Sequence, residues 1–585
     1  MNNTFILSDE TISIKTIIKQ INFENKQIIS LSDLNFTTES EWHDFTSKLF
    51  KDNPSKLIIP ISISTDMTSN TNTNGLIISM HIRLNYELPL SQRLVPIILL
   101  SDFNKNNILD KLNSEGKTPI QNYNLQSLFF TKGIYLSSFD IDEIKKTIEV
   151  ASPCPNDEYK CNILNKIKII PDENIRNHSI ANSWGCFKLA SVSGLGDEIL
   201  NHPAISKKLK SMQAKYLISY NNAYTEEKRL DREPIVCNGK KILHIDDQSD
   251  EGWSKVMKNI FKSAGNDFIS IDSSEYKNKE TGKFHNFDGF YEECQKQIEK
   301  NWDIIIIDLR LNPESEDIDD DMFNPYEFSG YRLLCEFLFE NEGCQIIIST
   351  ASNKIWYVNE ALKRGATSYF IKESPEFNYS LKETNNYFQI FKNDVKDCFN
   401  KSYLRDLFKI IKDIKKENRV GSINFISECD VLLDTAWLLI KKENLGFGFF
   451  TLFQVVELYA DEYYYYKDNF ININDNPVAM IKKIDNNSYE LKLKYHFDQE
   501  NGSYFTDEVE QKDEKPSVTT LFKISCALKF KFKQDNKLLK NFGRLNKIRN
   551  DIAHQGLTIR IESAVDEIKD ILGIIQLISS PICSA

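Results

Sequence analysis

The sequence feature that most constrains the fold is a short apolar run that ends in a carboxylate near the middle of the chain. Residues Ile304–Ile307 are continuous and β-branched, as expected of a strand that is buried on both faces of a parallel sheet. Other short strand-like runs lie at Ile242–Ile245, Ile346–Ile348 and Thr367–Ile371. Helical patterns lie between them, at Gly330–Phe339 and Asn353–Arg364. The alternation predicts a doubly wound α/β sheet, whose functional site lies outside the carboxyl ends of the strands.

The residues at the ends of these runs form a chemically coherent set. Asp246 and Asp247 follow the first run and Asp308 follows the second. Crowded carboxylates stay ionised together only with a cation, and hard oxygen ligands suit Mg²⁺, so we expect these three residues to bind it. Asp308 can then attack a phosphoryl group in line. Thr350 and Lys372, at the ends of the last two runs, can hold the phosphoryl oxygens.

Residues 237–377 resemble the receiver domains of bacterial response regulators. The matching elements are Asp246-Asp247, Asp308–Pro313, Ser329–Leu334, Thr350-Ala351, Gly365-Ala366 and Lys372. The resemblance implies that Asp308 is the phosphoacceptor, that Tyr369 is the aromatic switch residue and that a cognate histidine kinase is a partner. The sequence departs from the family where Glu373 and Ser374 follow the lysine in place of proline, and where an acidic insert, Glu314–Phe328, divides the loop after Asp308.

Residues 1–150 contain a fainter pattern of the same kind. We align Leu76–Asn85 with the strand and turn at Ile304–Asn312, Val95–Ser101 with the third run, and Lys132–Leu136 with the last. In this alignment His81 stands at the position of Asp308. We therefore predict a degenerate receiver-like domain that lacks the acceptor carboxylate, and the competing interpretation is an unrelated small α/β domain.

Residues 151–236 are interpreted as a helical hairpin or linker, with helical patterns at Asn174–Ala190 and Ile205–Tyr220. Within the first pattern, His178–Asn182 resembles the phosphoacceptor box of histidine kinases, in which His is followed four residues later by Asn or Thr. Two hypotheses stay open: His178 is a relay residue that feeds Asp308, or the hairpin serves as a spacer or for dimer contacts.

From residue 378 onward the pattern is mainly helical. A charged connector at 378–420 precedes a domain at 421–585, which also contains a polar segment of short strands around Ser488–Phe497. The amphipathic helices are expected at Phe425–Lys442, Phe449–Lys467, Val518–Phe532, Lys537–Ile552 and Ile561–Leu577. With 585 residues the chain is too long for one core, so we predict a multidomain protein. It combines doubly wound α/β domains with an all-α carboxyl-terminal domain that carries a small β insertion.

The last of these domains contains the pattern Leu-Asn-x-x-Arg-Asn-x-x-Ala-His, at Leu545–His554. A histidine moves protons near neutral pH and an arginine binds phosphate, which are the functions needed to activate a ribose 2′-hydroxyl against the adjacent phosphodiester without a metal. Arg549, Asn550 and His554 resemble the R-x4–6-H motif of HEPN ribonucleases. The resemblance implies that these three residues are catalytic, that the products are 2′,3′-cyclic phosphates, and that two motifs meet across a homodimer.

A basic stripe beside this motif suggests an RNA partner. Its candidate RNA-binding residues are Lys533, Lys537, Lys540, Arg544 and Lys547. The alternative is an ordinary solvated helix face with phenylalanines in the core. Glu457 and Tyr459 are further candidates to line the same pocket.

The composition excludes several classes of protein. A net charge of −12 argues against a protein that coats nucleic acid, although a local basic face is compatible with this charge. No apolar run reaches the length of a membrane span and the start Met-Asn-Asn-Thr lacks a secretory signal, so we expect a cytoplasmic protein without a membrane partner. The eleven cysteines form no C-x-x-C pair, which favours free buried thiols over a zinc site.

These patterns favour a signal-gated, metal-independent endoribonuclease in which the receiver controls cleavage of RNA, in antiphage defence or toxin-like growth arrest. The alternative is a non-catalytic signalling scaffold that uses the HEPN fold for dimerisation or protein binding. A third hypothesis is a transcriptional response regulator. The lack of a helix-turn-helix pattern after the receiver argues against it.

Overall fold

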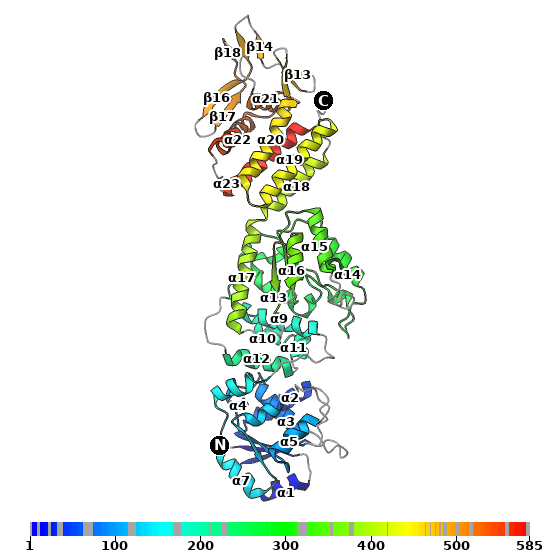
Figure 1. Cartoon of the computed structure of the whole chain (residues 1–585), viewed down its shortest axis with the longest axis vertical. Helices are drawn as coiled ribbons and strands as arrows, with labels where there is room; N and C mark the ends of the chain where they lie inside the picture. Colours follow the sequence, from blue (N-terminus) through cyan, green and yellow to red (C-terminus); the bar gives the residue numbers. More distant parts are fainter. Residues whose placement is uncertain are drawn as a thin grey trace. The chain divides into compact units, whose positions relative to one another are not determined.

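The structure is a computed structural model of the chain (Figure 1). It describes residues 3–580 except 9–11, 22–24, 32–38, 63–73, 115–124, 168–176, 210–211, 225–231, 280, 313–323, 352–354, 374–379, 418, 463, 468–469, 474–475, 479–480, 484–487, 499–501, 514–518 and 556–560. The chain divides into two compact units. The first comprises Met1–Gln297, Ile306–Arg332 and Ile347–Val395, and the second comprises Ile298–Ile305, Leu333–Ile346 and Lys396–Ala585.

The amino-terminal domain contains a five-stranded sheet in the order β2-β1-β3-β4-β5, whose neighbouring strands all pair in parallel. The strands are β1 (Thr4–Ser8), β2 (Lys26–Ser30), β3 (Lys56–Pro60), β4 (Ile97–Leu100) and β5 (Ile134–Ser137). The helices are α1 (Ile12–Gln20), α2 (Glu39–Leu49), α3 (Asn74–Leu84), α4 (Leu90–Arg93), α5 (Lys105–Ser114) and α7 (Ile141–Val150). Strand residues such as Ile6, Ile58 and Ile98 are fully buried, as a parallel sheet covered on both faces requires.

The predicted strand at Leu76–Asn85 is wrong, because this segment forms helix α3. Nearly all of α3 is buried, so its apolar residues face every direction and the helical period is lost from the sequence. The strand of this region is β3. A Cβ on Gly75 would lie 1.9 Å from the carbonyl oxygen of Pro60, and a Cβ on Gly330 would lie 1.9 Å from that of Asp308. Pro60, and not His81, therefore occupies the place that corresponds to Asp308.

Short helices fill the next part of the chain. They are α8 (Asn156–Glu158), a π-helical turn at Tyr159–Leu164, α9 (Asn177–Ser193), α10 (Gly196–Leu200), α11 (Pro203–Leu209) and α12 (Met212–Tyr224). The described residues of the second predicted helix, Ile205–Tyr220, lie in α11 and α12 and are helical. Helix α12 packs against α3, where Ser219 donates a hydrogen bond to the carbonyl oxygen of Leu84 at 2.7 Å. Lys215 Nζ lies 2.9 Å from Nδ1 of His81, and both side chains are buried.

The central domain repeats the strand order of the first. Its strands are β6 (Ile242–Ile245), β7 (Phe268–Ser270), β8 (Ile304–Asp308), β9 (Ile346–Thr350) and β10 (Ser368–Ile371), in the order β7-β6-β8-β9-β10. Its helices are α13 (Trp253–Ile260), α14 (Phe287–Gln295), α15 (Ser329–Glu340), α16 (Ile355–Arg364) and α17 (Leu381–Asn400). Four strands agree with the sequence pattern. Strand β7 escaped prediction because it has three residues, of which only Phe268 is buried.

The predicted connector at 378–420 is divided between its neighbours. On α17, Phe391 packs against Phe370 of β10 with ring centroids 4.9 Å apart, and Asp394 accepts a hydrogen bond from Ser368 at 2.6 Å. The next helix, α18 (Tyr403–Lys416), buries Leu407 and Ile411 in the core of the carboxyl-terminal domain.

The carboxyl-terminal domain is helical with a β insertion, as the periodicity predicts. Besides α18 its helices are α19 (Ile423–Lys441), α20 (Leu445–Glu462), α21 (Thr520–Cys526) with a π-helical turn at Ala527–Lys531, α22 (Asn536–Gln555) and α23 (Ile561–Ser579). Helix α20 packs against α19, α21, α22 and α23, and its residues Phe449, Leu452 and Val456 are fully buried. None of the helices in the described part of the chain is long and apolar enough to cross a membrane.

The β insertion lies between α20 and α21. Its strands are β11 (Tyr464–Lys467), β12 (Phe470–Ile473), β13 (Asn476–Val478), β14 (Ile481–Lys483), β15 (Tyr489–Leu491), β16 (Lys494–Asp498), β17 (Gly502–Thr506) and β18 (Glu510–Lys512). The hairpin of β16 and β17 lies beside α22 (Figure 1). At this contact a Cβ on Gly502 would lie 2.8 Å from the carbonyl oxygen of Gly543, so strand and helix backbones approach closely.

Candidate functional site

The strand ends of the central domain bring three carboxylates together. Asp246 and Asp247 follow β6, and Asp308 ends β8. Oxygen atoms of the three carboxylates lie within 4.8 Å of one another, and all three side chains are buried. Lys372, directly after β10, places Nζ 2.9 Å from Oδ2 of Asp246 and donates a short hydrogen bond to Asp308. The parallel topology therefore assembles four of the predicted residues at one edge of the sheet.

The charges of this cluster are not balanced. Burial raises the pKa of Asp247 well above its usual value, and the charges of Asp246 and Asp308 raise it further. Burial also raises the pKa of Asp308, although Lys372 opposes the effect. Lys372 contacts two of the three buried carboxylates, Asp246 and Asp308, so an added cation would relieve the repulsion at Asp247. Three oxygen ligands at this spacing suit a hard divalent ion such as Mg²⁺.

The other two predicted residues of this site lie on the neighbouring strands β9 and β10. Thr350 is buried at the end of β9, and its carbonyl oxygen accepts a hydrogen bond from the backbone nitrogen of Lys372 at 2.7 Å. Tyr369, on β10, is 39% exposed. The role of Tyr369 as a switch residue stays a prediction.

Several residues at the site were not singled out from the sequence. The ring of Trp253 lies 4.5 Å from Lys372 Nζ, and Nε2 of His244 lies 3.7 Å from Asp246. Asn182 of α9, 190 residues before the lysine, accepts a hydrogen bond from Lys372 Nζ at 3.0 Å. Asn182 belongs to His178–Asn182, the segment that resembles the phosphoacceptor box of histidine kinases. This resemblance is the sequence signal from which its role at the site could have been inferred. The side chain of His178 lies outside the described residues.

The second candidate site is at the carboxyl-terminal end of α22, which carries Arg549, Asn550 and His554. Nη2 of Arg549 pairs with Oε1 of Glu457 on α20 at 2.5 Å, and Nη1 donates to Oδ1 of Asn550 at 3.0 Å. The guanidinium also lies 5.6 Å from the ring of Phe450. These contacts hold the arginine in one orientation. His554 is exposed, one turn of helix beyond Asn550.

The remaining predicted residues of this domain lie in two different environments. Tyr459 is buried in the core, where its ring lies 5.0 Å from that of Phe425. Lys533 precedes α22, with a φ of 53°. Lys547 lies on α22 and is partly exposed. Of the two residues proposed to line the site from α20, Glu457 contacts Arg549 and Tyr459 packs in the core.

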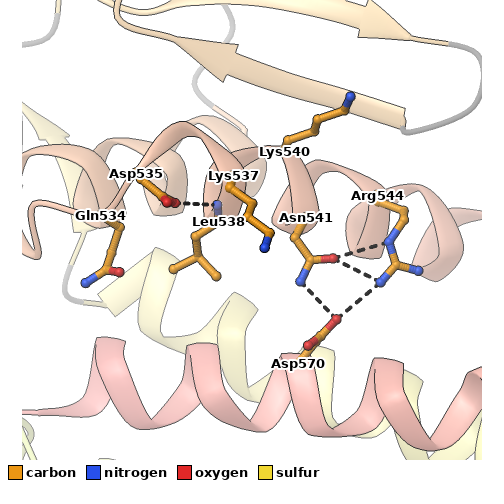
Figure 2. A pocket seen from close by; sticks show the side chains of 8 residues that line it. All are labelled: Gln534, Asp535, Lys537, Leu538, Lys540, Asn541, Arg544 and Asp570. Carbon is orange, nitrogen blue, oxygen red and sulfur yellow. Dashed lines mark hydrogen bonds and ion pairs between the residues drawn. The ribbon is translucent and has the colours of Figure 1, made fainter.

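A pocket of about 560 Å³ lies along the first half of α22 (Figure 2). It is lined by Gln534, Asp535, Lys537, Leu538, Lys540, Asn541, Arg544 and Asp570. Figure 2 shows Arg544 turned toward Asp570, and its Nη2 lies 3.3 Å from the carboxylate. Lys540 Nζ lies 5.6 Å from the ring of Tyr504 on β17. The structure thus brings three residues of the predicted basic stripe to one pocket, of which Arg544 is already paired with carboxylates.

Comparison with known proteins identifies the first domain. Residues 5–136 match the family model of the inactive receiver domain. No curated protein matches the chain. The match ends within β5, so it covers the whole five-stranded sheet up to its last strand. The prediction of a degenerate receiver-like domain is confirmed, and Pro60 at the acceptor position gives a physical reason for the lost activity, since proline has no carboxylate to phosphorylate. Residues 5–136 of this chain thus match the inactive receiver domain family in sequence and form a parallel five-stranded α/β domain.

Proposed function

We propose that the chain is a signal-regulated, metal-independent endoribonuclease. In this proposal the central domain accepts a phosphoryl group on Asp308 from a cognate histidine kinase, and the carboxyl-terminal domain cleaves RNA as a homodimer. The observation that carries the proposal is the fixed position of Arg549 beside Asn550 on the same helix as His554, with Glu457 as its partner.

The proposed chemistry of the central domain follows from its strand-end residues. The carboxylate of Asp308 forms a bond to phosphorus while the bond from phosphorus to the imidazole nitrogen of the kinase's phosphohistidine breaks, and that nitrogen leaves with the electron pair. Asp246, Asp247 and Asp308 would hold Mg²⁺, which supplies the positive charge that offsets the crowded oxygens. Lys372 holds a phosphoryl oxygen as a point charge, and the Thr350 hydroxyl donates to another.

The proposed chemistry of the carboxyl-terminal domain needs only side chains. His554 takes the proton of the ribose 2′-hydroxyl while that oxygen attacks phosphorus. The bond to the 5′-oxygen breaks, and this oxygen takes up a proton from water as it leaves. Arg549 and Asn550 bind the phosphoryl oxygens, on which negative charge develops. The products are a 2′,3′-cyclic phosphate and a 5′-hydroxyl. The pocket with Lys537 and Lys540 supports an RNA partner, because cations along α22 can bind phosphates of the same strand.

The test is cleavage of labelled single-stranded RNA by the purified full chain, in EDTA, with and without prior incubation with acetyl phosphate and Mg²⁺. We expect cleavage by the wild type and a loss of about 100-fold or more in His554→Ala and Arg549→Ala, the range for removing a general base or an oxyanion partner. His285→Ala is the matched control, because His285 is an exposed histidine of the other compact unit. Equal behaviour of all four proteins in both conditions would end the ribonuclease proposal.

A non-catalytic signalling scaffold is the second candidate function. The observation that favours it is the inactive receiver domain itself, since one domain of the chain already lacks the chemistry of its family. Under this hypothesis His554→Ala and Arg549→Ala keep the full cellular effect of the wild type. A growth assay on cells that express each protein at matched levels separates the two functions.

A further inference from the structure

Helix α9 covers the candidate acceptor site of the central domain. A lysine ammonium has three donors, and those of Lys372 meet Asn182 of α9, Asp246 and Asp308. Asn182, Asp246 and Lys372 are all buried. The side chain of Asp308 is only 6% exposed. In open α/β sheets this edge is where ligands bind, so its closure by a helix from another part of the chain is a specific feature of this protein.

The helix fits the site closely enough to require two glycines. A Cβ on Gly185 of α9 would lie 2.9 Å from the carbonyl oxygen of Glu373 and 3.2 Å from Cβ of Lys372. In the central domain, Gly252 precedes α13 with a φ of +110°, and a Cβ there would lie 3.2 Å from Sγ of Cys186 on α9. Helix and central domain therefore touch at positions where neither has room for a side chain.

Polar contacts anchor the same helix along its length. Lys188 Nζ lies 3.7 Å from Oε2 of Glu373, and both side chains are buried. Near the end of α9, Asn259 of α13 donates a hydrogen bond to the carbonyl oxygen of Ser193 at 3.0 Å. Together with Asn182 these contacts span three turns of the helix, so α9 is docked as a unit.

We propose that α9 is an internal cover of the acceptor site, and that docking of α9 and phosphorylation of Asp308 exclude each other. A phosphodonor must approach the carboxylate of Asp308 in line, and this approach needs space that α9 closes. By linkage, a phosphoryl group on Asp308 disfavours docking as strongly as docking disfavours phosphorylation. Phosphorylation thereby releases α9 and exposes side chains that are buried when the helix is docked. The inference rests on the proposed acceptor role of Asp308.

The experiment measures the rate at which acetyl phosphate with Mg²⁺ labels the full chain, followed by intact-protein mass. Gly185→Ala forces α9 away from Glu373 while favouring the helix itself, because alanine is the better helix former. Asn182→Ala removes the hydrogen bond to Lys372. Gly573→Ala is the control, since a Cβ there meets no atom within 4 Å. We expect both α9 variants to be labelled about tenfold faster or more, because labelling proceeds from the undocked fraction. The control should match the wild type.

Two further measurements separate the possible failures. Asp308→Asn should remove the label, and hydrogen exchange should show that α9 amides of the wild type lose protection after labelling. Equal labelling rates in the wild type and both α9 variants, with unchanged α9 protection, would overturn the cover while the acceptor role stands. Absence of label in every form, Gly185→Ala included, would overturn the acceptor role and the cover with it.

Discussion

Replacement of Lys372 by methionine tests the account of the acceptor cluster. Methionine keeps an apolar stem of similar length but removes the ammonium that bonds Asp246 and Asp308. Removing one partner of a buried ion pair costs about 3–5 kcal/mol, because the other partner is left without compensation. At about 2–4 °C per kcal/mol for a domain of this size, the unfolding transition of the central domain should fall by roughly 6–20 °C.

The assay is differential scanning calorimetry of the full chain in EDTA, in which the transition that moves is assigned to the central domain. Lys363→Met is the matched control. The side chain of Lys363 is 76% exposed and its ammonium pairs with Glu360 on the same helix, so its loss should cost less than about 0.5 kcal/mol. Added Mg²⁺ should recover part of the loss in Lys372→Met, since it supplies charge to the same carboxylates. A transition within about 1 °C of the wild type would refute the reasoning from buried charge.

Three more predictions concern other contacts. Glu457→Gln should lower the rate of RNA cleavage about tenfold, because it removes the ion pair that orients Arg549. It should cost less than about 1 kcal/mol of stability, because this ion pair is partly exposed. Single-turnover cleavage and thermal unfolding measure the two effects, and an unchanged cleavage rate contradicts the prediction. Gly502→Ala should destabilise the carboxyl-terminal domain by about 2 kcal/mol, since the φ of Gly502 is +75° and the added Cβ meets Gly543. Urea unfolding, with Gly573→Ala as the control, measures the loss, and equal midpoints of the two variants contradict the prediction. Burial, against the charge of Glu373, lowers the pKa of Lys188 to about 8. The unfolded chain therefore binds more protons above pH 8, so stability should rise from about pH 8 to 10 and this rise should be absent in Lys188→Met.

Local patterns were sufficient for four strands of the central domain and for most helices of the carboxyl-terminal domain, although β7 was not predicted and the predicted helix Phe449–Lys467 extends wrongly into strand β11. Strands β8 and β9 contain continuous β-branched runs and β6 is a short, mostly apolar run, and strands of this kind signal burial on both faces of a sheet. Once the sheet is parallel, the carboxyl ends of its strands share one edge, so the meeting of Asp246, Asp308 and Lys372 follows from their position in sequence. Amphipathic helices such as α19, α22 and α23 were predictable for a similar reason, because one face packs in the core and the other meets water.

The same local rules failed for α3, which is buried on all sides. Such a helix shows a continuous apolar run, and a run of this kind does not distinguish a helix from a strand. The error shifted the alignment of the first domain and put His81 where Pro60 belongs. The absence of an acceptor was nevertheless predicted correctly, because neither residue carries a carboxylate and the domain matches the inactive receiver family.

The contact between α9 and the central sheet came from the tertiary structure alone, and Asn182 meets Lys372 across 190 residues. Glu457, a candidate for the pocket of Arg549 from the sequence, meets it across 92 residues, but the ion pair between them is seen only in the structure. No periodicity relates such residues, since their meeting depends on how whole helices pack and on where glycines let backbones approach. The amino-acid sequence was therefore enough to place the carboxylates at the edge of the central sheet. Folding in three dimensions placed α9 over that edge, because close packing against Gly185 and Gly252 and the polar contacts of Asn182 and Lys188 act together only when the segments meet.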